Sequence, residues 1–326
     1  MRLLILGGTQ FVGKHIVLTA LDRGHDVTIF TRGKGRDDLP ETVERLRGDR
    51  DGDLSALQGR TWDACIDVSG YVPRIVRASA EQLRESVSFY AFISTVSVYA
   101  DFSEAPITED SPLIDLPDKT VEQITGETYG GLKVLCEQAV RDVYGDRCSM
   151  IRPDIVAGAF DPTDRFTYWV ERLANNAASG LPILAPGDGS DLIQFVDARD
   201  LAAFTLHTVE ERVSGAFNVC GDALRFDEFL SRAASALGVT PTLEWKDVPF
   251  LQQNEVTWND LPMFVPSASE QRGLMDVSNE RAKAAGFTPR DVEDTVGSVH
   301  GWTVTRTSPE RRAGMSAERE QELLKA

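Results

Sequence analysis

The sequence predicts an α/β protein built on a doubly wound parallel sheet, with a smaller α/β domain toward the C-terminus. Two observations carry this prediction. An apolar segment at residues 2–6 runs directly into Gly7 and Gly8, and a helical pattern follows. Short apolar segments and helical patterns then alternate through the first half of the chain, as they do where helices connect parallel strands.

The first strand–helix–strand unit explains the glycines. The apolar run 2–6 is typical of a buried parallel strand, and residues 11–23 have helical periodicity. Gly24 ends this helix, and a second apolar strand covers 27–30. A glycine-rich turn that leads into a helix places backbone N–H groups around a pyrophosphate, so we expect a dinucleotide site here.

The remaining elements of the first half continue the alternation. Residues 100–125 are rich in acids and contain three prolines, so we expect a loop there. The expected strands are 42–47, 64–68, 88–95 and 148–152, and the expected helices are 53–57, 74–86 and 126–144.

The second half is less regular. Its expected strands are 193–196 and 216–219, and its expected helices are 165–178, 197–211, 226–237, 280–285, 292–302 and 317–324. Because the stretch around the last strand is able to return to the sheet, we expect residues 1–160 and 191–222 to form the dinucleotide-binding domain. Residues 161–190 and 223–326 then form the smaller substrate domain.

Composition excludes several classes of protein. The 326 residues are 42% apolar and 26% charged, which is ordinary for a globular chain. No apolar run is long enough to span a membrane, and the N-terminal one is too short for a secretory signal. The four cysteines lie far apart without metal-ligand spacing, which favours free thiols, a cytoplasmic location and no bound metal. A net charge of −17 repels nucleic-acid phosphates, so we expect no nucleic-acid partner.

The end of the second strand carries the first chemical signal. A site for NAD usually has an acidic residue here, which binds the ribose hydroxyls. This chain instead has Thr31-Arg32, with Lys34 close by. A guanidinium suits a phosphate, so we expect NADP in preference to NAD. The alternative is that Arg32 is a solvated surface residue.

A cluster of hydroxyl groups closes the strand 88–95. Ser94, Thr95, Ser97 and Tyr99 come where the chain should leave the core, at the strand ends that bind ligands in such sheets. The alternative interpretation is a turn held by local side-chain-to-backbone hydrogen bonds.

Tyr129 and Lys133 open the long helix expected at 126–144. Positions four apart share a helix face, so the phenol and the ammonium are neighbours. A cation beside a phenol stabilises the phenolate and lowers the pKa of the phenol. We therefore expect Tyr129 to act as a general acid/base for a hydroxyl or carbonyl group, with Tyr99 as the next candidate.

In this order, the glycine turn, the hydroxyl strand end and the Tyr–Lys pair resemble the extended short-chain dehydrogenase/reductase superfamily, in particular its sugar-nucleotide epimerase/dehydratase group. The resemblance covers roughly residues 1–220 and implies a Rossmann-type fold with NAD or NADP as cofactor. Gly7-Gly8-Thr9 with Phe11 looks most like the branch that contains the chloroplast stem-loop-binding proteins. Gln10 departs from the pattern, because most extended members have a glycine there.

The resemblance also implies roles for individual residues. Thr95 orients the substrate oxygen, Tyr129 transfers the proton, and Lys133 shifts the pKa of Tyr129 and contacts the ribose. The nicotinamide carries the hydride. The implied cofactor-binding residues are Gly7, Gly8, Thr9, Gln10, Phe11, Val12, Gly13, Thr31, Arg32, Lys34, Asp49, Arg50, Val68, Ser69, Gly70, Pro153 and Ile155.

The expected function is NAD(P)-dependent chemistry on a hydroxyl or carbonyl group of a small molecule, with sugar derivatives among the candidates. There are two alternatives. One is a nucleotide-sugar epimerase/dehydratase, and the other is a non-catalytic NADP-binding protein with an RNA-binding or regulatory role. The second alternative resembles the NmrA-like regulators, which bind dinucleotide but lack the Tyr–Lys pair. The intact pair and the acidic charge favour an enzyme. A homodimer is the candidate assembly.

The substrate side carries fewer signals. Many nucleotide-sugar members of the group have an Arg-Asp pair just before the strand that precedes a late Asp-Leu/Val-Ala helix, and these positions align with Ile193 and Gln194. The missing arginine indicates a less charged hydroxy or keto substrate. Arg165, at the start of a helix, is the candidate substitute or else an exposed first-turn residue. The candidate substrate residues are therefore Tyr99, Arg165 and Gln194.

Overall fold

The computed structural model describes residues 1–306 and 311–325. Its main body is a seven-stranded parallel sheet with the order β11-β6-β5-β4-β1-β2-β3. The direction of winding reverses beside β1, which confirms the predicted Rossmann-type sheet. The strands are β1 (Arg2–Leu6), β2 (Asp26–Thr31), β3 (Glu44–Arg47), β4 (Trp62–Asp67), β5 (Val87–Ile93), β6 (Cys148–Pro153) and β11 (Gly215–Val219).

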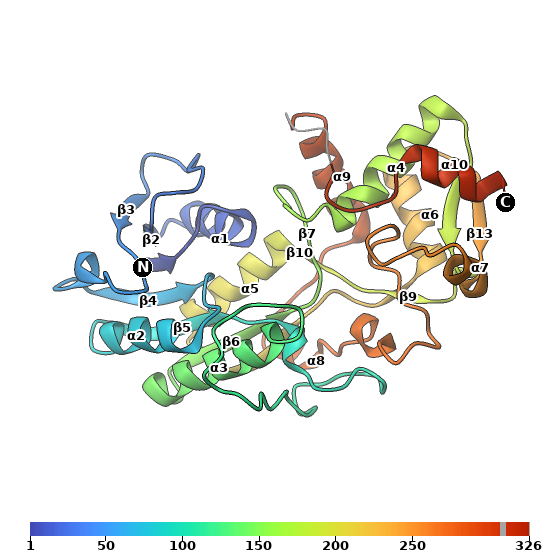
Figure 1. Cartoon of the computed structure of the whole chain (residues 1–326). Helices are drawn as coiled ribbons and strands as arrows, with labels where there is room; N and C mark the ends of the chain where they lie inside the picture. Colours follow the sequence, from blue (N-terminus) through green and yellow to red (C-terminus); the bar gives the residue numbers. More distant parts are fainter. Residues whose placement is uncertain (307–310, 326) are drawn as a thin grey trace.

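Two pairs of helices cover the two faces of this sheet (Figure 1). In β1, Leu3 and Ile5 pack toward α1 and α5, whereas Leu4 and Leu6 pack toward α2 and α3. Both faces are therefore buried, which explains why this strand is apolar throughout instead of alternating. The four helices are α1 (Phe11–Asp22), α2 (Pro73–Leu83), α3 (Tyr129–Tyr144) and α5 (Ala198–Glu210).

Some predicted boundaries in this half are wrong by a few residues. The helix expected from residue 126 begins at Tyr129, because Thr128 closes a turn by donating to the carbonyl of Gln123 at 2.6 Å. The helix expected at 53–57 is a single 3-10 turn, η1 (Ser55–Leu57). A second 3-10 turn, η2 (Val96–Val98), follows β5 and was not expected from the sequence.

A second apolar core lies beyond the sheet and is rich in aromatic rings, among them Trp169, Phe226 and Phe229. Three helices surround it, and a parallel pair of short strands closes one side (Figure 1). These elements are α4 (Arg165–Ser179), α6 (Phe226–Ala236), α9 (Val292–Thr303), β8 (Ile183–Pro186) and β13 (Leu243–Lys246). The two strands were not expected from the sequence.

The strand expected at 193–196 is divided in the structure. Its first part, β9 (Leu192–Ile193), pairs with β12 (Leu224–Arg225), and its second part, β10 (Val196–Asp197), pairs with β7 (Val156–Ala157). Within residues 191–222, the strand β11 joins the main sheet beside β6, as expected. The division of the chain into two domains at the predicted boundaries stays a prediction.

The C-terminal helix α10 (Ala317–Lys325) lies beside β8, as Figure 1 shows. Its buried Glu320 accepts a hydrogen bond from Arg172 of α4 at 2.6 Å and one from the backbone N–H of Leu184 at 2.9 Å. The described part of the chain holds no helix with both the length and the apolar character that a membrane span requires. The remaining elements are α7 (Val248–Gln253), η3 (Arg272–Met275) and α8 (Glu280–Ala284).

Candidate functional site

A cavity of about 910 Å³ lies at the carboxyl ends of the parallel strands, where doubly wound sheets bind ligands. It extends from the glycine turn after β1 to the start of α4 and the loop after α7. The predicted residues that line it are Gly7, Gly8, Thr9, Gln10, Phe11, Val12, Gly13, Thr31, Arg32, Lys34, Asp49, Arg50, Val68, Ser69, Thr95, Tyr129, Lys133, Pro153, Ile155 and Arg165.

The glycine turn leaves the backbone open to a ligand. Gly7 and Gly8 have φ angles of +106° and +99°, which residues with a side chain rarely adopt. A Cβ atom on Gly13 would lie 2.8 Å from the Cα of Gly8, so only glycine allows α1 to approach the turn this closely. The turn leads straight into the N-terminus of α1. The residues present therefore fit the pyrophosphate of the implied dinucleotide.

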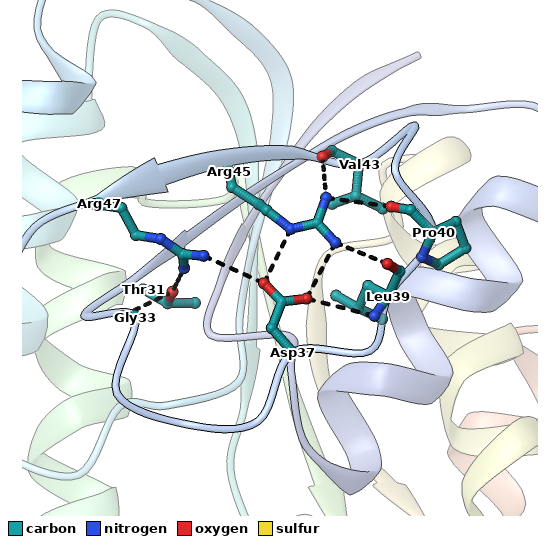
Figure 2. A network of polar contacts seen from close by, with 8 residues as sticks. All are labelled: Thr31, Gly33, Asp37, Leu39, Pro40, Val43, Arg45 and Arg47. Carbon is teal, nitrogen blue, oxygen red and sulfur yellow. Dashed lines mark hydrogen bonds and ion pairs between the residues drawn. The ribbon is translucent and has the colours of Figure 1, made fainter.

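At the end of β2, two arginines of β3 enclose a carboxylate, as Figure 2 shows. Arg45 donates to Asp37 from Nε at 2.9 Å and from Nη2 at 3.1 Å, and Arg47 adds a contact at 3.3 Å. The hydrogen bonds from Arg45 are the main cause that holds the pKa of the Asp37 carboxyl below its usual range. Arg47 also donates to the hydroxyl of Thr31. The acid in this part of the cavity is therefore already bound by cations.

Arg32 and Lys34 line the same part of the cavity and are exposed. Neither forms an ion pair with a residue that the structure describes. Two unpaired cations beside a carboxylate that is fully engaged are suited to an anionic group, which keeps the prediction of a 2′-phosphate contact open.

Arg50 and Asp49, two predicted cofactor-binding residues, have different surroundings in the structure. The guanidinium of Arg50 binds both carboxylate oxygens of Asp67, at 2.7 Å each, and donates to Ser79 Oγ at 3.0 Å. Although Arg50 lines the cavity, its charge is therefore committed to the protein. Asp49 accepts a hydrogen bond from the backbone N–H of Asp51 at 3.1 Å, and its contact with a cofactor stays a prediction.

Thr95 and Tyr129 meet on one wall of the cavity. Thr95 Oγ1 accepts from the backbone N–H of Ser97 at 3.1 Å and so caps η2. The same hydroxyl lies close enough to the Tyr129 phenol to oppose the burial effect that raises the pKa of Tyr129. The turn interpretation of the hydroxyl cluster is therefore confirmed, and the role of Thr95 toward a substrate stays a prediction.

Lys133 also lines the cavity and is 3% exposed. Its ammonium donates to the carbonyls of Gly70 and Ile93, at 2.8 and 2.6 Å. Burial lowers the pKa of Lys133 to about 8. Burial also raises the pKa of Tyr129 to about 12, which corrects the prediction that the ammonium lowers it. The phenol holds its proton at neutral pH and is suited to donate it to a carbonyl oxygen.

Three predicted residues do not line the cavity. The buried Tyr99 hydroxyl donates to Asn218 Oδ1 at 2.6 Å and accepts from Arg152 at 3.1 Å. Gln194 binds backbone groups alone, donating to the carbonyls of residues 221 and 277 and accepting from the N–H of residue 277. Gly70 is buried, and its carbonyl holds Lys133. The structure places all three outside the cavity wall, and their direct contact with a ligand stays a prediction.

Several residues of the cavity wall were not singled out from the sequence. Tyr71 directly follows the predicted strand-end glycine, so its position was accessible to the same reasoning. No sequence signal places four further residues at the cavity. Ile124 and Trp258 lie in loops without periodicity, Arg47 ends β3, and Leu274 lies in η3.

Comparison with known proteins finds a family match over part of this chain. Residues 70–220 match the family described as the NAD dependent epimerase/dehydratase family. The match includes α3 with Tyr129 and Lys133, and it confirms the predicted resemblance to the extended short-chain dehydrogenase/reductase superfamily.

Two curated relatives and one solved structure extend the comparison. The chain is 26% identical over 261 residues to a chloroplast stem-loop binding protein of 41 kDa from Arabidopsis thaliana, across 74% of this chain and 65% of that protein. It is 28% identical over 189 residues to a UDP-glucose 4-epimerase from Azospirillum brasilense, across 50% and 51% of the two chains. The chain thus spans less than two thirds of either relative.

The solved structure shares the fold. The Bordetella bronchiseptica enzyme WbmH in complex with NAD+ superimposes with a TM-score of 0.67 over 94% of this chain and 99% of that one, at 14% identity. At this level of identity the likeness concerns the Rossmann-type architecture alone.

Proposed function

We propose that the protein is an NAD(P)-dependent enzyme that acts on a hydroxyl or carbonyl group of a small molecule. One observation carries this proposal: Thr95 and Tyr129 meet, above the buried Lys133, on a cavity wall continuous with the glycine turn. A bound nicotinamide supplies the hydride chemistry. The position of this wall supports placing the reacting carbon beside Tyr129.

The proposed roles follow from the contacts. Tyr129 donates a proton to a carbonyl oxygen in the reducing direction and accepts it back in the other. Thr95 lies beside the phenol and is proposed to hold the substrate oxygen at the same point. Lys133 fixes the start of α3 against Gly70 and Ile93, and its remaining N–H is available to a ribose hydroxyl.

Replacing Tyr129 with phenylalanine tests the proposal. Tyr129→Phe should bind NAD or NADP normally and lose turnover by roughly 10²–10⁴-fold, because it removes the proposed acid/base. Turnover is followed by nicotinamide absorbance with a panel of hydroxy and keto compounds. Tyr144→Phe on the same helix is the control, because the Tyr144 hydroxyl is buried without a hydrogen-bond partner in the described chain. Near-normal turnover in Tyr129→Phe would refute the assignment.

The cofactor is proposed as NAD or NADP. Exposed Arg32 and Lys34 support NADP, whereas the name of the family and the NAD+ complex of WbmH favour NAD. Titration of the purified protein with both dinucleotides separates the two. Binding of an RNA stem-loop without turnover of the nicotinamide would instead support the non-catalytic alternative that the Arabidopsis relative suggests.

Nucleotide-sugar epimerisation is the second candidate, favoured by the similarity to a UDP-glucose 4-epimerase. A thermal-shift screen of UDP-, GDP- and dTDP-sugars in saturating cofactor tests it. A ligand at about 100 times its dissociation constant adds about 2.7 kcal/mol of stability. We expect no such shift, because Arg165 is the one unpaired cation on the described substrate side of the cavity. A clear shift that Arg165→Ala abolishes would show that the site binds a nucleotide sugar and would support the epimerase/dehydratase alternative instead.

A further inference from the structure

The outer part of the cavity, formed by loops that follow β4, precede α3 and follow α7, has an apolar rim. Tyr71, Ile124 and Trp258 are large apolar side chains that remain 43%, 49% and 40% exposed. Leu274 of η3 completes the rim. Exposed apolar side chains from separate loops that gather around one opening indicate a ligand with a bulky apolar part.

Arg165, the first residue of α4, is held in this opening by its Nε atom. Nε donates to Thr163 Oγ1 at 3.1 Å, and the Thr163 hydroxyl donates in turn to Asp161 at 2.7 Å. Asp161 is 2% exposed, so the chain of hydrogen bonds is anchored in the interior. The two terminal nitrogens of Arg165 have no hydrogen-bond partner among the described residues. A fixed guanidinium with a free fork of N–H groups matches a carboxylate.

The charge of Arg165 is not cancelled by the carboxyl groups around it. No ion pair joins Arg165 to another described residue. Burial raises the pKa of both Asp154 and Asp161, the two carboxyl groups on which the charge of Arg165 acts. The same charge opposes the burial effect that raises the pKa of Tyr129, so the guanidinium and the phenol lie near the same part of the cavity. The N-terminal end of the α4 dipole adds to this positive potential.

We propose that this part of the cavity binds a monocarboxylate that carries an aromatic or similarly bulky apolar group. Arg165 binds the carboxylate, and the rim formed by Tyr71, Ile124 and Trp258 covers the apolar group. This inference rests on the proposed function, because the carbonyl or hydroxyl group of the same molecule has to reach Tyr129. One free guanidinium matches one carboxylate, so a hydroxy or keto acid fits the site better than a diphosphate does.

A set of keto acids tests the charge part of the proposal. Benzoylformate, benzoylpropionate and benzoylbutyrate differ in the distance between carbonyl and carboxylate, and each has a neutral methyl ester of nearly the same shape. Dissociation constants are measured by titration calorimetry on protein saturated with its dinucleotide. We expect at least one acid to bind at least about tenfold more tightly than its ester, as a charge-assisted pair allows.

Substitutions assign this preference to individual residues. Arg165→Gln should abolish the difference between acid and ester, while Arg165→Lys should keep part of it. Arg36→Gln is the control, because the Arg36 side chain is 85% exposed and does not line the cavity. Dinucleotide affinity, measured on each variant, verifies that the fold is intact. Levulinate, the methyl counterpart of benzoylpropionate, should bind at least about tenfold more weakly, and Trp258→Ala should reduce this difference.

The outcomes separate this inference from the proposed function. If Tyr129→Phe abolishes turnover and no acid is preferred over its ester, the proposed function stands and the monocarboxylate site is refuted. An acid preference that survives in Arg165→Gln also refutes it, as does tighter binding of UDP-glucose at the same site. If no dinucleotide binds, the proposed function fails first. If Arg165→Gln loses the preference for the acid over its ester and Arg36→Gln keeps it, the monocarboxylate site is supported.

Discussion

Arg50 and Asp67 form a two-pronged ion pair between the cavity wall and the buried end of β4. The carboxylate is fully buried, and the guanidinium side chain is 10% exposed. Asp67 also accepts from the hydroxyl of Tyr90 at 2.9 Å and the N–H of Ser69 at 3.1 Å. One buried charge pair therefore ties the loop after β3 to β4 and β5, next to the predicted cofactor residues.

Removing the cation of this pair should destabilise the fold. Arg50→Met leaves the Asp67 carboxylate buried without its counter-charge, and we expect a loss of about 3–5 kcal/mol in the free energy of unfolding, measured with urea. Adding Asp67→Asn should recover a large part of this loss. Arg74→Met is the control, because Arg74 pairs with Asp51 and Glu122 at the exposed surface and its loss should cost far less stability. Equal losses in the two arginine variants would contradict the assigned role.

Features of the site that depend on neighbouring residues were predictable from the sequence, whereas features that depend on contacts between distant residues were not. The glycine turn, the strand end at Thr95 and the Tyr129–Lys133 spacing are local patterns, and the sequence placed all of them on the cavity wall. Contacts between distant residues are not periodic, so the commitment of Arg50 to Asp67 was not foreseen. The direction of the pKa shift of Tyr129 was also missed, because burial depends on how the whole wall packs.

Burial of Lys133 predicts a specific pH dependence of stability. The folded-state pKa is lowered from 10.5 to about 8, so the unfolded chain binds more protons between these values. Stability should therefore rise with pH across this window, by about 3 kcal/mol from this group alone. The measurement is the difference in unfolding free energy between wild type and Lys133→Met across the window. Lys119→Met, at an exposed position, controls for the loss of a lysine. A flat difference would contradict the prediction.

Gly130 allows α3 to approach η2, which carries the Thr95 turn. A Cβ atom at this position would lie 2.0 Å from the carbonyl oxygen of Ser97, a backbone atom that has little room to move. We expect Gly130→Ala to lose about 1–3 kcal/mol of stability or more, and to lose turnover because Thr95 and Tyr129 separate. Gly126→Ala, with no atom within 4 Å of the new Cβ, is the matched control. Wild-type stability in Gly130→Ala would show that the close approach is not required.

The charged groups that follow β2 determine the expected cofactor preference. Asp37 is bound by Arg45 and Arg47, so its oxygens are already occupied where an NAD site offers a carboxylate to the ribose. Arg32 has no such partner in the described chain and lines the cavity.

A charged contact from Arg32 to a 2′-phosphate contributes roughly 1.5–3 kcal/mol, about 10- to 100-fold in affinity. We therefore expect NADP to bind more tightly than NAD by this factor, and Arg32→Ala to remove the difference while leaving NAD affinity unchanged. Arg36→Ala, in the same loop but outside the cavity wall, should keep the wild-type preference. Both dissociation constants are measured by fluorescence titration with the reduced dinucleotides. If NAD binds as tightly as NADP and Arg32→Ala changes neither constant, Arg32 is a solvated surface residue and the argument for NADP is removed.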